Sequence, residues 1–216
     1  MAAASALGLR ERKKLRTKQT IVDVSTRLFL EQGYNQTTLA QVAEESEVAL
    51  STFFNYFPTK VDLVFCFFDE VIESARTRIV DRPEGEGAID AIESWIREVL
   101  PGVEHPYENA IRRMPEIIAG TPELEAEERL RFAFLEDALA EGFARDLGES
   151  ARSMHARVLA SMALHGMDEV WRTWWEKHVN DAELGFDDAL TAKADYVVEL
   201  LRTGLGLVRS LPAPPA

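Results

Sequence analysis

A short run of polar side chains at helical spacing could read the base edges of a nucleic acid. The side chains are those of Ser51, Thr52, Asn55 and Tyr56. Ser51 and Asn55 are four residues apart, as are Thr52 and Tyr56, so on a helix each pair projects from one side. Hydroxyl and amide groups form the hydrogen bonds that recognition of bases and phosphates in a DNA major groove requires. The pattern therefore predicts a surface that binds DNA.

Two short helices and a tight turn are expected to position these side chains. Thr38 and Gln41 match a capping box, which predicts that the first helix begins at Leu39. Pro58 disfavours the helical conformation at the residue before it, so the second helix is predicted to run from about Leu50 to Tyr56. Two helices and a turn in so few residues are typical of a helix-turn-helix motif.

A third helix start follows directly and offers a place for a phosphate. Thr59 and Asp62 form another cap pattern, so a helix is expected to begin at Lys60, which puts a cation beside the free amides of a helix N-terminus. We also expect Thr37 and Thr38 to hold phosphates. The complete set of predicted DNA-binding residues is Lys18, Thr37, Thr38, Leu50, Ser51, Thr52, Asn55, Tyr56 and Lys60.

The charge of the chain is unevenly distributed. The net charge of −13 argues at first sight against a nucleic-acid partner. Residues 1–60 nevertheless hold eight Lys and Arg against six Asp and Glu, whereas residues 81–216 hold 14 against 27. A basic run from Arg10 to Lys18 contains one acidic residue, Glu11. Such a run is often only a solubilising tail, but beside a helix-turn-helix it favours a phosphate-binding arm.

The segment STFFNYFPTKVDLV, which follows VAEES, resembles the TetR family of bacterial transcriptional regulators. The resemblance is carried by Thr52, Phe53, Phe54, Tyr56, Phe57, Pro58, Lys60 and Leu63, and it is specific over residues 13–65. Two positions depart from the family pattern, because Glu47 stands where Gly is usual at the turn and Phe54 where Tyr is usual. A left-handed non-Gly residue costs on the order of 1 kcal/mol, and Phe54 lacks a hydroxyl that could reach a phosphate, so we expect weaker DNA affinity and an intact fold.

The periodicity of the chain is helical almost throughout, which predicts an all-α protein of about nine helices. The longer helices are expected at about 13–32, 60–80, 88–100, 107–119, 122–147, 150–178 and 186–210. We predict a helix-turn-helix domain of three helices with its basic arm over residues 1–65. A helical ligand-binding and dimerisation domain is predicted over residues 66–216, because the resemblance implies that the last two helices form a four-helix dimer interface and the middle helices enclose a ligand.

Other functional classes have little support. Among the four histidines, His155 and His165 could lie along one helix face, but no carboxylate or thiol beside them is at ligand spacing, so no metal site is expected. We find no nucleophile motif, Gly-rich phosphate loop or CxxC pair, so neither an enzyme nor a bound cofactor is expected. Cys66 lies among apolar residues and is predicted to be buried. No run approaches 18 apolar residues and no signal segment is recognisable, so a cytoplasmic protein that contacts no membrane is expected.

Tryptophan and methionine residues gather toward the C-terminus. Met167, Trp171, Trp174 and Trp175 follow a helical stripe, which is typical of core or subunit-interface packing and also suits the lining of an apolar ligand pocket. Both interpretations can hold at once. The predicted pocket residues are Trp95, Met114, Phe132, Met162, His165, Trp171 and Trp175, with Arg112 or Arg113 as a further polar contact.

These features together predict a homodimeric, ligand-responsive transcriptional regulator. The expected partners are a pseudo-palindromic operator and a hydrophobic or amphipathic small molecule that releases it, which would make the protein a repressor. The helix at 60–80 is expected to transmit the signal, because it carries more apolar surface than a three-helix module can cover. The alternative is a helical small-molecule binding protein that has lost specific DNA binding; a cofactor-dependent helical enzyme is a third possibility.

Overall fold

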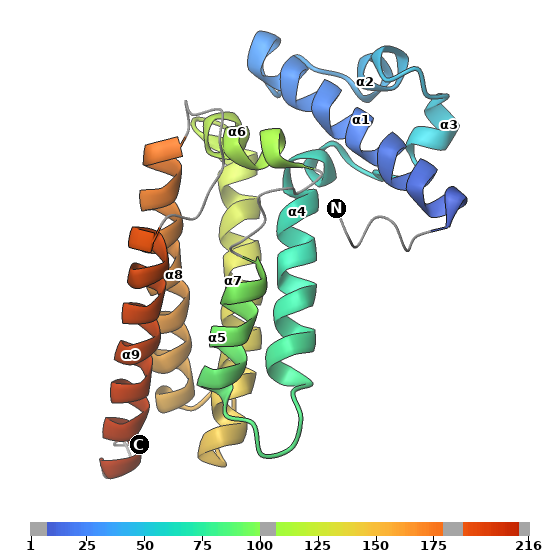
Figure 1. Cartoon of the computed structure of the whole chain (residues 1–216). Helices are drawn as coiled ribbons and strands as arrows, with labels where there is room; N and C mark the ends of the chain where they lie inside the picture. The colour runs from blue at the N-terminus through green and yellow to red at the C-terminus, as the bar shows by residue number, and fades with distance from the viewer. Residues whose placement is uncertain (1–7, 100–106, 179–187, 212–216) are drawn as a thin grey trace. The chain divides into compact units, whose positions relative to one another are not determined.

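The computed structural model describes residues 8–99, 107–178 and 188–211, and all regular secondary structure in these ranges is helical (Figure 1). The α-helices are α1 (Leu9–Gln32), α2 (Leu39–Glu45), α3 (Leu50–Phe53), α4 (Lys60–Ala75), α5 (Ala88–Val99), α6 (Glu108–Ile118), α7 (Pro122–Leu147), α8 (Met154–His178) and α9 (Asp188–Ser210). α4 continues as a π-helical segment, Arg76–Val80. The predicted all-α fold with an N-terminal helix-turn-helix is confirmed. No helix in the described ranges is both long enough and apolar enough to cross a bilayer.

Contacts divide the chain into two compact units. The first contains Met1–Phe68 and Glu104–Glu128, and the second contains Asp69–Val103 and Arg129–Ala216. α4 and α7 each run from one unit into the other along the chain. This division differs from the predicted domains, 1–65 and 66–216, because it groups α6 with the N-terminal helices. The predicted domain boundary stays a prediction.

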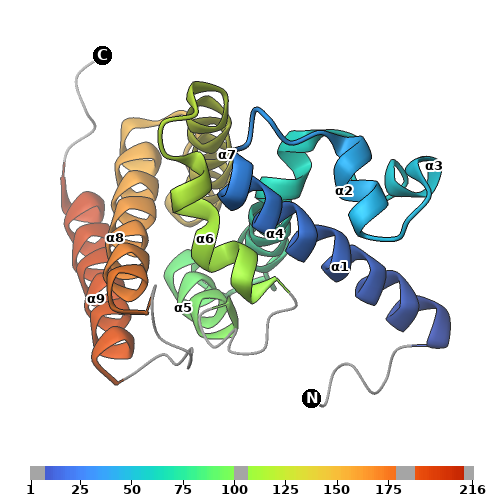
Figure 2. The ribbon, with the colours of Figure 1, turned by 90° about the horizontal axis from the view of Figure 1, so that it is seen from above.

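In the first unit, α1 contacts α2 and α6, and α2 contacts α3 (Figure 2). Thr38 caps α2 as predicted: its backbone N–H donates to Oε1 of Gln41 (2.9 Å), and the Gln41 N–H donates to the Thr38 hydroxyl (3.2 Å). Phe53 and Phe57 are buried, with their ring centroids 6.2 Å apart. This aromatic pair fixes which side of α3 faces the core.

The turn between α2 and α3 keeps its shape without glycine. Glu47 has a φ of 56°, which is the left-handed conformation expected at this position from the resemblance to the TetR family. The Val48 N–H donates to the carbonyl of Ala43 (2.9 Å), so the turn is closed by a backbone hydrogen bond. The strain of a non-Gly residue here, on the order of 1 kcal/mol, is small beside the burial of two Phe side chains.

α1 and α3 differ from the predicted spans. α1 begins at Leu9 rather than about Lys13, so the whole basic run, Arg10–Lys18, is helical. The α-helical part of α3 ends at Phe53, three residues earlier than predicted. After it, the Tyr56 N–H donates to the carbonyl of Phe53 (2.8 Å), a bond between residues three apart that tightens the chain. Pro58 has no N–H with which to continue the helix.

The second unit has its core among α5, α7, α8, α9 and the end of α4. In Figure 1, α8 and α9 lie side by side, and they make extensive contact. Gly166 permits this approach, because a Cβ atom there would lie 2.7 Å from Cγ1 of Val197 on α9. Gly142 on α7 serves the same purpose against the π-helical segment, where a Cβ atom would lie 2.6 Å from Cγ2 of Ile79.

Candidate DNA-binding surface and ligand cavity

The polar face predicted on α3 is open to solvent. Ser51, Thr52 and Asn55 are exposed and Tyr56 is half-buried, while Phe53 between them points into the core. Within the described residues, none of these four polar side chains makes a hydrogen bond or an ion pair. Leu50 is also exposed, at the start of the helix. Ser51 and Thr52 lie on α3 itself, and Asn55 and Tyr56 lie in the turn that follows it. The fold thus presents a row of uncommitted donors and acceptors on a short, anchored helix and its C-terminal turn.

Thr37 and Thr38 are placed differently from each other. Thr38 is exposed, and its hydroxyl both accepts from the Gln41 N–H and donates to Gln41 Oε1 (3.0 Å). Thr37 is only 1 % exposed, and its hydroxyl donates to the carbonyl of Gly33 (3.0 Å) and accepts from Gln32 (3.1 Å). Its side chain is therefore occupied inside the protein, and this geometry does not favour Thr37 as a phosphate contact.

Lys60 also makes internal bonds that sequence reasoning missed. Its ammonium group donates to the carbonyls of Tyr34 (2.9 Å) and Thr37 (3.2 Å) and lies 4.1 Å from the centre of the Tyr34 ring. The predicted cap is present, since the Thr59 N–H donates to Asp62 Oδ2 (2.8 Å). Lys60 thus fastens the chain between α1 and α2 to the start of α4. Its effect on DNA would act partly through this turn.

The Lys18 side chain is half-buried, unlike the other cations of the basic run. Its ammonium group is 5.1 Å from the centre of the Tyr107 ring and 5.9 Å from that of Phe57, so its charge faces aromatic rings. Five other cations in the first turns of α1 are exposed, and within the described ranges they make no ion pair; they are Arg10, Arg12, Lys13, Lys14 and Arg16. These side chains are free to meet phosphates.

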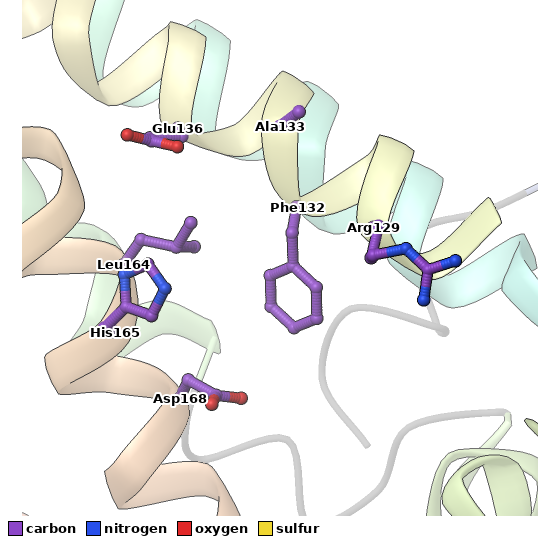
Figure 3. Close-up of a pocket in the computed structure, with 7 residues that line it drawn as sticks. All are labelled: Arg129, Phe132, Ala133, Glu136, Leu164, His165 and Asp168. Carbon is purple, nitrogen blue, oxygen red and sulfur yellow. The ribbon is translucent and has the colours of Figure 1, made fainter. Parts of the chain in front are cut away.

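A cavity of about 270 Å³ lies between α7 and α8, within the second unit (Figure 3). Its lining residues are Arg129, Phe132, Ala133 and Glu136 on α7 and Leu164, His165 and Asp168 on α8. The α7 set follows the i, i+3, i+4, i+7 pattern of one helix face. Figure 3 shows the Phe132 ring projecting between Arg129 on one side and Asp168, His165 and Leu164 on the other. The cavity therefore combines apolar surface with charged groups.

The residues predicted for the pocket separate into several environments. Phe132 and His165 line the cavity. Trp95 is buried in the core of the second unit, where its indole N–H donates to the Ser74 hydroxyl (2.9 Å), and Trp171 packs half-buried against the same core. Met114 is buried in the first unit, and Met162 is 40 % exposed on α8. The side chain of Trp175 lies outside the described residues.

The electrostatics of the cavity centre on Asp168. Loss of hydration raises the pKa of its carboxyl group above the usual value, and nearby His165 partly opposes that rise in pKa. Glu136 has a partner, since its Oε1 lies 3.3 Å from Nη2 of Arg157. In the part of the chain that the structure describes, no group of three or more His, Cys, Asp or Glu side chains is arranged to hold a metal ion.

Exposed apolar side chains form a continuous pattern on α8 and α9. They recur at intervals of four or seven residues and comprise Met154, Val158 and Met162 on α8 and Tyr196, Leu200 and Leu207 on α9. Their spacing places them along one face of each helix. Apolar surface of this extent on two packed helices is typical of a subunit interface.

Comparison with known proteins agrees with this geometry. Residues 21–65 match the family described as bacterial regulatory proteins, tetR family, and residues 86–202 match the MftR C-terminal domain. The chain is 34 % identical over 141 residues to the HTH-type transcriptional regulator TcmR of Streptomyces glaucescens, covering 62 % of this chain and 61 % of TcmR. It is 26 % identical to the fatty acid metabolism regulator protein of Bacillus subtilis (strain 168), covering 86 % of this chain and 93 % of that protein.

Among solved structures, NalD, the secondary repressor of the MexAB-OprM multidrug efflux pump in Pseudomonas aeruginosa, has a similar fold. It superimposes with a TM-score of 0.57 at 20 % identity, covering 88 % of this chain and 96 % of NalD. This likeness concerns the fold alone, and the match to TcmR spans less than two thirds of that protein. The two family matches cover most of the chain, and they agree with the helix-turn-helix and the helical unit that follows it. The chain belongs to the TetR family of bacterial regulatory proteins.

Proposed function

We propose that this protein is a homodimeric repressor whose α3 helices bind a pseudo-palindromic operator and whose α7–α8 cavity binds a hydrophobic or amphipathic effector that releases the DNA. The observation that carries the proposal is the row of uncommitted polar side chains on α3 and the turn after it, which are exposed except for the half-buried Tyr56 and are held by a buried aromatic pair. The rival hypothesis of lost DNA binding rested partly on Glu47, and the closed turn at that residue removes this support. A DNA-binding role places the protein in the cytoplasm.

Two-fold symmetry follows from the small size of the reading surface. One short α3 helix contacts too few base pairs for useful specificity, whereas two helices in a dimer read two half-sites about one helical turn or more apart. The exposed apolar faces of α8 and α9 supply a surface on which a second copy can pack. A stable interface of this kind buries more than about 1,000 Å².

Two helices link the cavity to the DNA-binding unit through the chain itself. α7 carries Phe132 and Glu136 of the cavity, and its first residues, up to Glu128, belong to the first unit. α4 begins with Lys60 in the first unit and continues into the second. A ligand that moves either helix changes the DNA-binding unit. It must favour the non-binding arrangement by about 5.5 kcal/mol to reverse a 99:1 population.

Asn55→Ala tests the proposed reading surface. The exposed amide at Asn55 is expected to contact a base edge, so its loss should weaken binding to the operator by about 1–3 kcal/mol, roughly five- to 150-fold. Binding to a scrambled duplex should change little, because phosphate contacts supply most of that affinity. Fluorescence anisotropy with both duplexes at one salt concentration measures the difference.

The matched control is Asn109→Ala, which removes an exposed amide from α6. It should leave both affinities unchanged. An equal loss of affinity for operator and scrambled DNA in Asn55→Ala would show that Asn55 contributes to general adhesion and not to sequence reading.

A further inference from the structure

The α7–α8 cavity has an apolar side that accommodates a hydrocarbon or aromatic group. Leu164 is buried and Phe132 is half-buried, and Ala133 adds a small apolar surface beside them. The volume of about 270 Å³ equals the space of about nine water molecules. A compact aromatic group or the head of a longer amphipathic molecule fits such a space.

His165 presents a hydrogen-bond acceptor to this cavity. Its Nδ1 lies 2.9 Å from the carbonyl oxygen of Ser161. A carbonyl only accepts, so Nδ1 carries the hydrogen and donates it. In the neutral ring the other nitrogen, Nε2, then bears a lone pair and accepts.

Asp168 adds a carboxylate that lacks a partner. Within the described residues Asp168 makes no hydrogen bond or ion pair. The neighbouring carboxylates differ in this respect. Glu136 forms an ion pair with Arg157, and Glu169 accepts hydrogen bonds from both Nη2 and Nε of Arg172. Asp168 is exposed at the edge of the cavity. Partial loss of hydration there raises the pKa of its carboxyl group. A cationic ligand would replace that lost hydration with an ion pair.

Arg129 is the cationic residue in the cavity lining. Its position bears on whether the cavity favours a cationic or an anionic ligand. Figure 3 shows its guanidinium group directed away from the Phe132 ring, while the Asp168 carboxylate and the His165 ring lie on the other side of that ring. The apolar surface around Leu164 is therefore bordered by acceptors. An anion bound against Leu164 would face these acceptors, with the Arg129 guanidinium group on the far side of the Phe132 ring.

We propose that the effector carries a protonated amine whose N–H groups donate to Asp168 and to Nε2 of His165, with its apolar body against Phe132 and Leu164. This rests on the regulatory role proposed above for the same cavity. The Phe132 ring adds a favourable contact, because an aromatic face attracts a cation. An alcohol of the same shape retains the apolar contacts but lacks the charge, and a carboxylate of the same shape carries the opposite charge.

Three matched probes test the proposal on the full-length protein: 4-phenylbutylamine, 4-phenylbutan-1-ol and 4-phenylbutyrate. Ligand-observed NMR titration measures each dissociation constant. The amine should bind about tenfold or more tightly than the other two, because hydrogen bonds to a charged group are the stronger class. Asp168→Asn should remove that preference, while Glu169→Gln, which neutralises the adjacent carboxylate outside the cavity, should keep it.

Tighter binding of the carboxylate, equal binding of all three probes, or an amine preference that survives in Asp168→Asn would overturn the proposal. Thermal unfolding of both variants checks that they fold, and Asp168→Asn should do so because its side chain has no partner to lose. Operator affinity is measured separately with each saturating probe. Amine binding without operator release would support the assigned ligand chemistry and contradict the proposed regulation, whereas release by the carboxylate alone would support regulation and contradict the ligand chemistry.

Discussion

Arg82→Met is expected to lower the free energy of unfolding by about 3–5 kcal/mol, because it leaves a buried carboxylate without its cation. The Arg82 side chain is 1 % exposed and forms an ion pair with Asp146 on α7. Its guanidinium group also donates to the carbonyls of Ile79 (2.6 Å), Glu86 (2.8 Å) and Gly142 (3.0 Å). One side chain therefore joins the π-helical segment, the following loop and α7.

Asp146 extends this network to the start of α5. Its Oδ2 accepts the N–H of Ala88 at 2.7 Å, so the carboxylate is needed even when the arginine is gone. The variant then holds a buried charge and three carbonyls that have lost a donor, each of which costs free energy. Urea denaturation followed by circular dichroism measures the loss.

Arg76→Met provides a matched control six residues earlier, at the start of the π-helical segment. Arg76 pairs with Glu141 at 3.4 Å, and both side chains are more than a third exposed. An exposed pair of this kind contributes at most about 1 kcal/mol. If Arg82→Met destabilised the protein no more than Arg76→Met does, the buried network would not hold these elements together.

Leu200→Glu is expected to convert the dimer into monomers at micromolar concentration. Leu200 is 45 % exposed on α9, within the apolar face that we assign to the interface. A two-fold interface contains the residue twice, so two carboxylates would be buried where two Leu side chains had packed. The loss of about 1.5–3 kcal/mol per Leu side chain alone raises the dimer dissociation constant by about a hundredfold or more.

Sedimentation velocity measures the mass of the Leu200→Glu variant, which should be that of a monomer. Its operator affinity should also fall, because the two α3 helices are no longer linked in a dimer. The control is Arg209→Glu, an exposed change nine residues further along α9 and thus on the opposite face. That variant makes the larger change in charge and should remain dimeric. A dimeric Leu200→Glu variant would place the interface elsewhere.

The helix-turn-helix was predictable because its signals are local. Thr38 with Gln41 and Thr59 with Asp62 are caps that act within one helical turn, and both appear in the structure as reciprocal or backbone hydrogen bonds. Cys66 is buried, as its apolar neighbours predicted. The start of α1 was missed because Gly8 has no capping side chain; its backbone N–H donates to Glu11 instead (3.2 Å).

The cavity was only partly predictable, because a helical stripe shows that a face is covered without showing what covers it. Trp95 has the bulk of a pocket residue, yet its face is filled by the core of the second unit. Asp168 was not predicted as a pocket residue, since nothing in the sequence places it in the same cavity as Phe132. The buried role of Arg82 was likewise invisible, because Asp146 lies 64 residues away.

Sequence-specific binding of DNA through α3 is measured as the affinity for the DNA upstream of the protein's own gene. Fluorescence anisotropy compares that duplex with a scrambled duplex of equal length at one salt concentration. A dimeric TetR-family regulator that reads bases through α3 should bind the first at least about 10³-fold more tightly, at one dimer per site. Equal affinity for the two duplexes would contradict sequence-specific binding at that site and favour a small-molecule binding protein that no longer reads DNA.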